Sequence, residues 1–240
     1  WQCRLPANQR RNVRAGFFGV GVVTPAQAEF NDSGVYTHAA VDATFCCNSE
    51  FQLVTVWGER SEADAVPQLI FAALCNSRTR AAYDSVFASL KSKCPRFMPT
   101  TFTCDFERAM WSSFQDTFSS QFQGCLFHLL QSATKQMHNK GVPKESRGRL
   151  KNLIRDVALA PDDNFFFVAL ELLWRFGGSP VEESRCGTAP GCQAFNRYFY
   201  ESYICGGVAP VKSWAAKDRA FSSVAGGPDR ITLTNNLAEN

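Results

Sequence analysis

The sequence predicts a mixed α/β protein interrupted by a helical segment. Three observations predict this fold class: early residues alternate with a period of two, central apolar residues repeat at helical spacing, and the composition after Asn139 is helical. We expect three antiparallel strands plus two parallel strands with flanking helices, interrupted by an all-helical insertion.

The first strands are predicted from alternation and from β-branched residues. Val35 to Phe45 alternates along its length, Asn48 to Glu50 is typical of a turn, and Phe51 to Trp57 and Pro67 to Leu74 form two more strands. The short connections indicate an antiparallel meander. Gly16 to Gly21 is expected to be a turn, because no phosphate-binding strand-loop-helix unit follows it.

Helices and strands alternate in the next region. The predicted helices are marked by apolar stripes, which are Tyr83, Val86, Phe87 and Leu90 in the first, Met110, Phe114 and Phe118 in the second, and Leu130, Ala133 and Met137 in the third. Thr100 to Cys104 forms a strand that ends at Asp105, and Phe122 to Phe127 forms another. This order of elements is that of a ribonuclease H-like core, in which the first and fourth strands lie side by side.

Residues 139–211 are expected to be the helical insertion. Its apolar stripe is Leu150, Leu153, Ile154 and Val157. Asp162 or Asp163 can cap a helix that reaches Arg175, a loop from Pro180 to Gly191 follows, and Phe195 to Tyr203 forms an aromatic helix. We expect residues 1–34 to extend from an upstream region, residues 35–138 to form the first part of the core, and residues 212–240 to return to it as a truncated segment.

Composition narrows the class of protein. The 240 residues contain no uninterrupted apolar run near the ~18 residues of a membrane helix, so we expect no membrane span. Most of the ten cysteines lie in apolar runs, among them Cys46, Cys47, Cys75, Cys104 and Cys125, which indicates reduced, buried thiols in an intracellular, nuclear protein. The net charge of +3 is too small to indicate nucleic acid by itself.

Three acidic residues form the predicted metal site. Asp42 and Asp105 lie at or near strand ends, and Glu239 lies in a polar context that is typical of a helix start. Carboxylate oxygens suit Mg²⁺ or Mn²⁺, and two such ions would activate water or a hydroxyl for attack on a phosphodiester.

Four motifs in order carry a resemblance to a known family. They are Asp42-Ala43-Thr44-Phe45, Asp105-Phe106-Glu107-Arg108-Ala109, Gly124-Cys125-Leu126-Phe127-His128 and Thr234-Asn235-Asn236-Leu237-Ala238-Glu239. This pattern resembles the Mutator-like (MULE) transposase domain of the Asp-Asp-Glu group. The resemblance implies a ribonuclease H-like fold, with Asp42, Asp105 and Glu239 as catalytic metal ligands and Cys125 and His128 as an accompanying motif. It also implies double-stranded DNA as partner, both transposon ends and target, and it is compatible with a homo-oligomer.

Simpler interpretations stand beside these assignments. Asp105 can be the N-cap of the next helix, Glu107 a partner of that helix dipole, and Asp42 a solvent-facing charge on an edge strand. Zinc held by Cys125, His128, Cys186 and Cys192 is the weaker interpretation, because the spacing of the two later cysteines is unusual. Trp214 and the aromatic residues from Tyr198 to Tyr203 are interpreted as core in preference to base-stacking platforms.

A basic segment is the candidate DNA contact. It contains Lys144, Arg147, Arg149 and Lys151, whose simpler role is a solvated helix face. The favoured function is a DNA transposase catalytic domain. A transposase-derived DNA-binding or regulatory protein without catalysis is the alternative, and a ribonuclease H-type nuclease leaves the insertion unexplained. Because the chain stops after Asn240, we expect little activity from a fragment that ends there.

Overall fold

The fold of the described residues is mixed α/β. The computed structural model describes residues 19–22, 36–44, 51–60, 66–176, 190–208 and 211–215. Its strands are hydrogen-bonded in the order β1 (Gly19–Val22), β4 (Gln68–Cys75), β3 (Gln52–Arg60), β2 (Tyr36–Thr44), β5 (Thr101–Cys104) and β6 (Gln121–Gly124). The mixed sheet is compatible with a ribonuclease H-like layout. Two compact units comprise residues 1–102 with 109–120, and residues 103–108 with 121–240.

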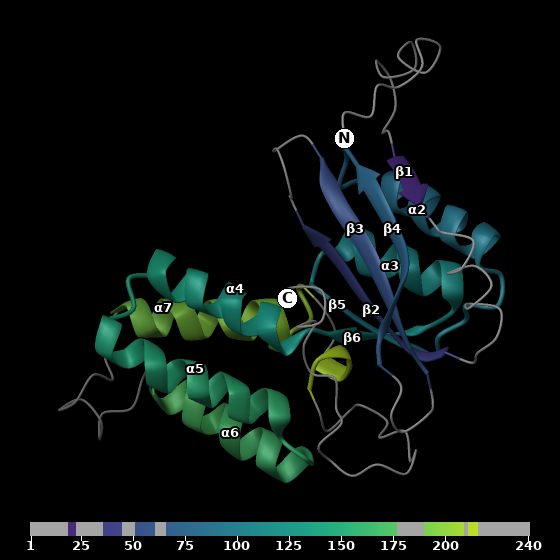
Figure 1. Cartoon of the computed structure of the whole chain (residues 1–240). Coiled ribbons are helices and arrows are strands. Elements are labelled where there is room, and N and C mark those ends of the chain that lie inside the picture. The colour runs from purple at the N-terminus through teal and green to yellow at the C-terminus, as the bar shows by residue number, and fades with distance from the viewer. Residues whose placement is uncertain are drawn as a thin grey trace. The chain divides into compact units, whose positions relative to one another are not determined.

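An antiparallel meander is the centre of the first unit. β2 (Tyr36–Thr44) pairs with β3 (Gln52–Arg60), which pairs with β4 (Gln68–Cys75) (Figure 1). Buried and half-buried residues alternate along β3, as expected for a strand with one face in the core. The predicted meander is confirmed, with β3 continuing to Arg60 instead of ending at Trp57.

A further strand joins the free side of this meander. β1 (Gly19–Val22) runs antiparallel to β4, with Gly19 opposite Cys75 and Val22 opposite Ala72. The expectation of a turn up to Gly21 was therefore wrong. Glycine weakens the alternation signal of a strand, whereas the edge of β4 still offers backbone groups for pairing.

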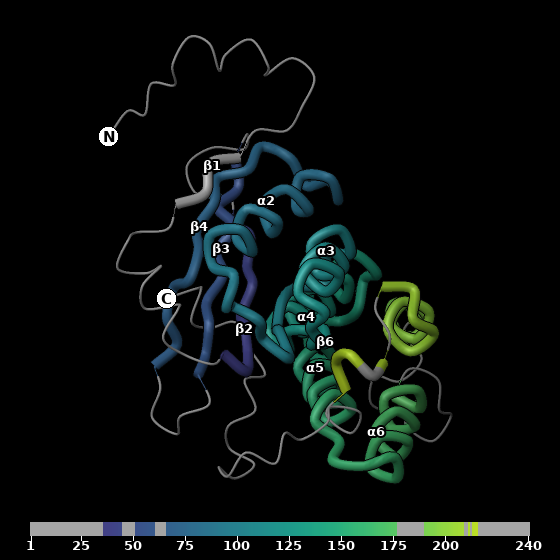
Figure 2. Tube along the Cα trace, turned by 90° about the vertical axis from the view of Figure 1, so that its right-hand side faces the viewer, coloured from purple at the N-terminus to yellow at the C-terminus, as the bar shows by residue number. Residues whose placement is uncertain are grey.

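Two helices cover one face of the antiparallel strands (Figure 2). α2 (Arg80–Lys93) begins after Thr79, whose hydroxyl accepts the N–H of Ala82 at 3.4 Å. α3 (Arg108–Phe118) buries the stripe predicted for it. The ring of Phe114 lies 5.1 Å from that of Phe87 on α2, so the helices share an aromatic contact.

A polar network also joins these helices on their outer side. The Arg80 guanidinium donates to the Asp84 carboxylate at 2.7 Å and to the Asp116 carboxylate at 2.6 Å. The Ser113 hydroxyl donates to Asp84 at 2.6 Å. Burial acts to raise the pKa of the Asp84 carboxyl, but the hydrogen bonds from Ser113 and Arg80 outweigh it, so this pKa lies below its ordinary value.

β5 (Thr101–Cys104) lies beside β2. The Thr37 carbonyl accepts the backbone N–H of Thr100 at 3.1 Å and the Thr100 hydroxyl at 2.7 Å, and the Thr101 hydroxyl lies 2.8 Å from Nδ1 of His38. The predicted adjacency of the first and fourth strands of the core is therefore confirmed.

The second unit consists of one short strand and a group of helices. Its elements are β6 (Gln121–Gly124), α4 (Leu126–Asn139), α5 (Lys144–Leu159), α6 (Asp163–Phe176), α7 (Pro190–Phe199), a π-helical turn (Tyr200–Ile204) and a 3₁₀ turn (Val211–Ser213). α4 packs against α7 and α5 packs against α6 (Figure 1). Asp162 accepts the backbone N–H of Phe165 at 3.0 Å, so the predicted cap of α6 is confirmed.

Two predicted boundaries in this unit were wrong. β6 ends at Gly124 instead of Phe127, because the Cys125 carbonyl accepts the N–H of Leu129 at 3.0 Å and so begins α4. Pro190 and Gly191 were expected in a loop but form the start of α7. Proline suits the first helical position, since its missing N–H would have no partner there.

Aromatic side chains form much of the core of the second unit. Trp214 is buried, and its indole N–H donates to the Tyr203 carbonyl at 3.3 Å. The Tyr203 hydroxyl donates to Ser132 at 3.1 Å, and its ring lies 5.3 Å from Phe199. The interpretation as core is confirmed for Trp214, Phe199 and Tyr203, but it was wrong for Tyr200, which is 42% exposed.

Candidate functional site

Asp42 occupies an interior strand. It lies in β2 opposite Thr55 of β3, and only 7% of its surface is exposed. β2 is flanked by β3 and β5, so the interpretation of Asp42 as a solvent-facing charge on an edge strand is wrong. Burial of a charged carboxylate lowers the stability of the fold unless cations or hydrogen-bond donors replace its lost hydration.

Asp105 follows directly after β5 and organises the next turn. Its Oδ1 accepts the backbone N–H of Glu107 at 2.9 Å. This bond to the residue two positions on is the geometry of an Asx turn, and it leads the chain into α3. The interpretation of Asp105 as the N-cap of α3 is therefore wrong, because the helix begins at Arg108 and the half-buried Asp105 carboxylate orders the turn before it.

Two of the sequence motifs contact each other through Phe106 and Gly124. A Cβ atom on Gly124 would lie 2.5 Å from the Phe106 ring and 3.1 Å from Cβ of Trp214. The Phe106 ring also lies 5.5 Å from that of Tyr203. Glycine at 124 therefore allows the ring next to Asp105 to sit against β6, which fixes the backbone that carries this aspartate.

Cys125 and His128 lie in the first turn of α4. The Cys125 N–H donates to the Cys104 carbonyl at 2.9 Å, and its thiol is buried. His128 is half-buried, with its ring 5.5 Å from that of Phe127.

Metal binding by cysteine and histidine finds no further support. Cys192 is buried on α7, whereas Cys186 lies outside the described residues. Among the residues that the structure describes, no group of three or more histidine, cysteine, aspartate or glutamate side chains could hold a metal ion. Cys75, Cys104 and Cys125 are buried thiols outside any disulfide, as predicted, and Cys46 and Cys47 lie outside the described residues.

The third predicted carboxylate has no described position. Glu239 and its motif, residues 234–239, lie outside the described residues. Asp42 belongs to the first unit and Asp105 to the second, so each is described in its own surroundings. As a donor set, the three carboxylates would offer only oxygen atoms, which suits Mg²⁺ or Mn²⁺ better than zinc.

The four predicted DNA-binding residues lie on α5 and differ in their surroundings. Arg147 donates from Nε to the Val142 carbonyl at 2.9 Å, and its Nη1 lies within 3.0 Å of the His138 ring nitrogens. The Arg149 guanidinium lies 4.8 Å from the centre of the Phe176 ring. Both arginines thus take part in structural contacts, whereas Lys144 and Lys151 are exposed.

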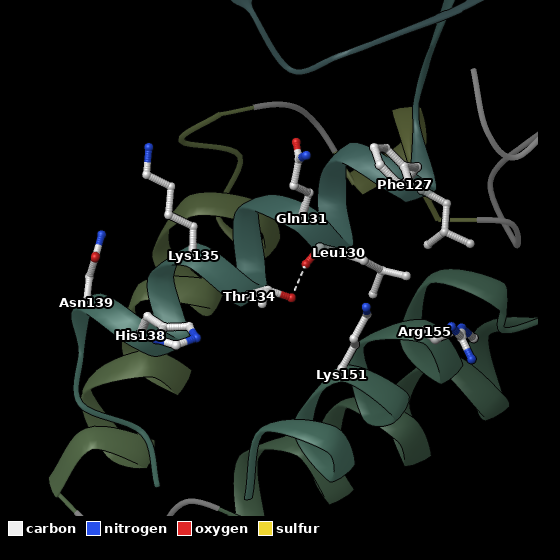
Figure 3. A pocket seen from close by; sticks show the side chains of 10 residues that line it. Phe127, Leu130, Gln131, Thr134, Lys135, His138, Asn139, Lys151 and Arg155 are labelled. Atoms are coloured by element: carbon white, nitrogen blue, oxygen red, sulfur yellow. Dashed lines mark hydrogen bonds between the residues drawn. The ribbon is translucent and has the colours of Figure 1, made fainter. Parts of the chain in front are cut away.

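A groove between α4 and α5 was not predicted from the sequence. Its volume is about 680 Å³, within the range of small-molecule sites (Figure 3). Leu126, Phe127 and Leu130 line one part of it, and Lys151 and Arg155 of α5 face them. The signal in the sequence was the four-residue spacing of Arg147, Lys151 and Arg155, which places these cations on one face of α5.

The fold and these sites define a mixed α/β protein with a buried strand carboxylate and a basic interhelical groove. No known family model matches the chain, and no curated protein matches it. Within the described ranges, the helices are too short or too polar to cross a membrane.

Proposed function

We propose that the chain is a DNA transposase catalytic domain of the Mutator-like type, which performs metal-dependent phosphodiester hydrolysis and strand transfer. One observation carries the proposal: β2, which bears the buried Asp42, is the neighbour of β5, which leads directly into Asp105. This is the strand order that a ribonuclease H-like core requires, and it is accompanied by the four ordered motifs.

The residues fit a hard divalent cation. Asp42 is a buried carboxylate on a regular strand, and Asp105 is oriented by the Glu107 N–H, so both would be held without flexible loops. With Glu239 they would hold Mg²⁺ or Mn²⁺, which would supply an activated oxygen nucleophile and charge stabilisation of the leaving oxygen.

The chain's own residues would supply position and charge. The contact of Phe106 with Gly124 fixes the backbone beside Asp105, and the exposed Lys144 and Lys151 would neutralise phosphates of the DNA backbone. Arg147 and Arg149 would act indirectly, since their side chains stabilise α5 through Val142, His138 and Phe176.

The proposal is tested by metal-dependent stability and cleavage. Mg²⁺ or Mn²⁺ should raise the melting temperature of the wild-type protein, because a ligand that binds only the native state stabilises it. Asp42→Asn or Asp105→Asn should abolish this rise, whereas Asp156→Asn, an exposed position on α5, should preserve it. An equal metal response in all four proteins would refute the carboxylate site.

A DNA-binding protein without catalysis is the second candidate, favoured by the exposed Lys144 and Lys151 on α5. Nicking of supercoiled plasmid with Mn²⁺ distinguishes the two functions. Loss of nicking in Asp42→Asn with unchanged DNA affinity supports the transposase. DNA binding by the wild type without cleavage under any divalent metal supports the second candidate.

A further inference from the structure

The groove between α4 and α5 combines an apolar wall with three cationic side chains. Lys135 of α4 and Lys151 and Arg155 of α5 line it, and its lining contains no aspartate or glutamate. None of these three cations has a hydrogen bond or ion pair with another residue in the described part of the chain. An anion entering the groove would therefore meet these cations without a competing carboxylate among the described lining residues.

The apolar wall lies across from two of these cations. Leu126, Phe127 and Leu130 lie on the first turns of α4, and Phe127 is 37% exposed although its ring is large and apolar (Figure 3). A purely hydrated anion gains nothing from such a wall. The ligand that matches both sides carries an anionic group and a flat apolar group.

Polar side chains occupy the rest of the α4 wall. Gln131 and Asn139 present amides, and the Thr134 hydroxyl donates to the Leu130 carbonyl at 2.7 Å, which leaves the oxygen oriented as an acceptor (Figure 3). Amides and hydroxyls recognise the edges of nucleobases, and aromatic rings stack on their faces. A fatty acid would use the cations and the apolar wall but would not use these amides.

One end of the groove is held rigidly. The Arg147 guanidinium joins the Val142 carbonyl and the His138 ring, so it links α5 to the end of α4 and to the connection between them. Lys151 and Arg155 follow it at intervals of four residues on the same face of α5. The helix pair therefore presents its cations from a fixed frame, which lowers the entropy lost on binding.

We propose that this groove is a binding site for a nucleoside phosphate unit. Its phosphate is bound by Lys151 and Arg155, and its base lies against Leu126, Phe127 and Leu130. The unit is either a free nucleotide or an unpaired nucleotide of a DNA strand, since both offer the same base and phosphate. The proposal does not depend on the carboxylates or on cleavage, although it shares Lys151 with the DNA contact of the proposed function.

Titration of the intact protein with three probes tests the site: dTMP, fluorescein-labelled oligo-dT of eight nucleotides, and inorganic phosphate. Arg155→Gln and Lys151→Gln should each weaken nucleotide binding by about tenfold or more, because each removes a charge-assisted hydrogen bond. Phe127→Ala should weaken dTMP or oligonucleotide binding by roughly fivefold or more, while leaving phosphate binding unchanged. Lys140→Gln, an equal loss of charge on an exposed residue outside the groove, should leave binding within about twofold.

The outcomes are distinct. Tight binding of dTMP identifies a free nucleotide as the ligand, and binding of the oligonucleotide but not of dTMP identifies an unpaired nucleotide of a DNA strand. In either case, the groove variants must lower the affinity for the probe that binds. Inorganic phosphate binding as tightly as both, or Lys140→Gln weakening binding as much as Arg155→Gln, overturns the proposal. Circular dichroism of each variant controls for folding, and Arg155→Lys, which retains the charge, should recover part of the affinity. Failure here leaves the metal response of Asp42 and Asp105 untouched, so it is separable from failure of the transposase proposal.

Discussion

Replacement of Gly124 by alanine should destabilise the second unit. The added Cβ would lie 2.5 and 2.6 Å from two ring atoms of Phe106, and 3.1 Å from Cβ of Trp214. Ordinary carbon contacts begin near ~3.5 Å, so the ring would have to withdraw by about 1 Å. Because it also packs against Tyr203 and Phe122, at 5.5 and 6.3 Å, it cannot withdraw without disturbing both contacts.

The expected magnitude follows from overpacking of a close-packed interior. Gly124→Ala should lower the free energy of unfolding by about 1–3 kcal/mol. Gly148→Ala is the matched control, since a Cβ there meets nothing within 4 Å and Gly148 lies inside α5. That substitution should raise stability by roughly 0.5–1 kcal/mol, because alanine has the higher helix propensity.

Urea unfolding followed by circular dichroism measures both variants, and a double-mutant cycle isolates the contact. Phe106→Leu removes ring atoms that the new Cβ would meet, so Gly124→Ala in that background should cost less than in the wild type, by about 0.5 kcal/mol or more. Equal stability of Gly124→Ala and the wild type would refute the packing argument. So would strict additivity of the two substitutions.

Two further predictions concern polar contacts. Hydrogen bonds from Ser113 and Arg80 lower the pKa of Asp84, so its contribution to stability is present above its unfolded pKa of about 4 and is lost as the pH falls through the lower, folded-state pKa. Melting temperatures between pH 2 and 6 should show that the difference between wild type and Asp84→Asn shrinks toward acid pH. A difference that stays constant contradicts this. Asn196→Ala should lower the free energy of unfolding by about 1–3 kcal/mol, because the buried Asn196 amide donates to the Leu173 and Trp174 carbonyls at 2.8 and 3.3 Å near the end of α6. Asn152→Ala, at an exposed position, is the control in the same unfolding assay. Equal stability of the two variants would show that these carbonyls do not need Asn196.

Periodicity predicted most elements because tertiary packing agrees with local pattern there. Met110, Phe114 and Phe118 repeat every four residues, and the structure buries all of them on α3. The prediction of secondary structure failed where a single hydrogen bond sets an element's boundary or where a strand forms only by pairing with a distant strand. Phe122 to Phe127 reads as one apolar strand, but the Cys125 carbonyl begins α4 in its middle, and β1 depends on β4, which lies about fifty residues away in the chain.

The candidate site was predictable only in part. Motif spacing led to the prediction of Asp42 and Asp105 as ligands; Asp42 lies in β2, and Asp105 directly follows β5, the strand next to β2. Sequence could not distinguish Arg147, which holds the α4–α5 connection, from Lys151, which faces the groove, because both are basic residues on one helix face. The apolar half of the groove was not predicted, since Phe127 was expected in a strand but lies in the first turn of α4.

The chain path between the two units constrains how the protein folds during synthesis. Residues 103–108 of the second unit emerge from the ribosome before residues 109–120, which complete the first. The first unit therefore cannot complete its fold until α3 has emerged. By then the turn at Asp105 has also emerged, but β6 and α4 of its own unit have not. Released chains that end near residue 105 lack α3, so they would expose the aromatic surface of Phe87 and Phe102 that Phe114 normally covers.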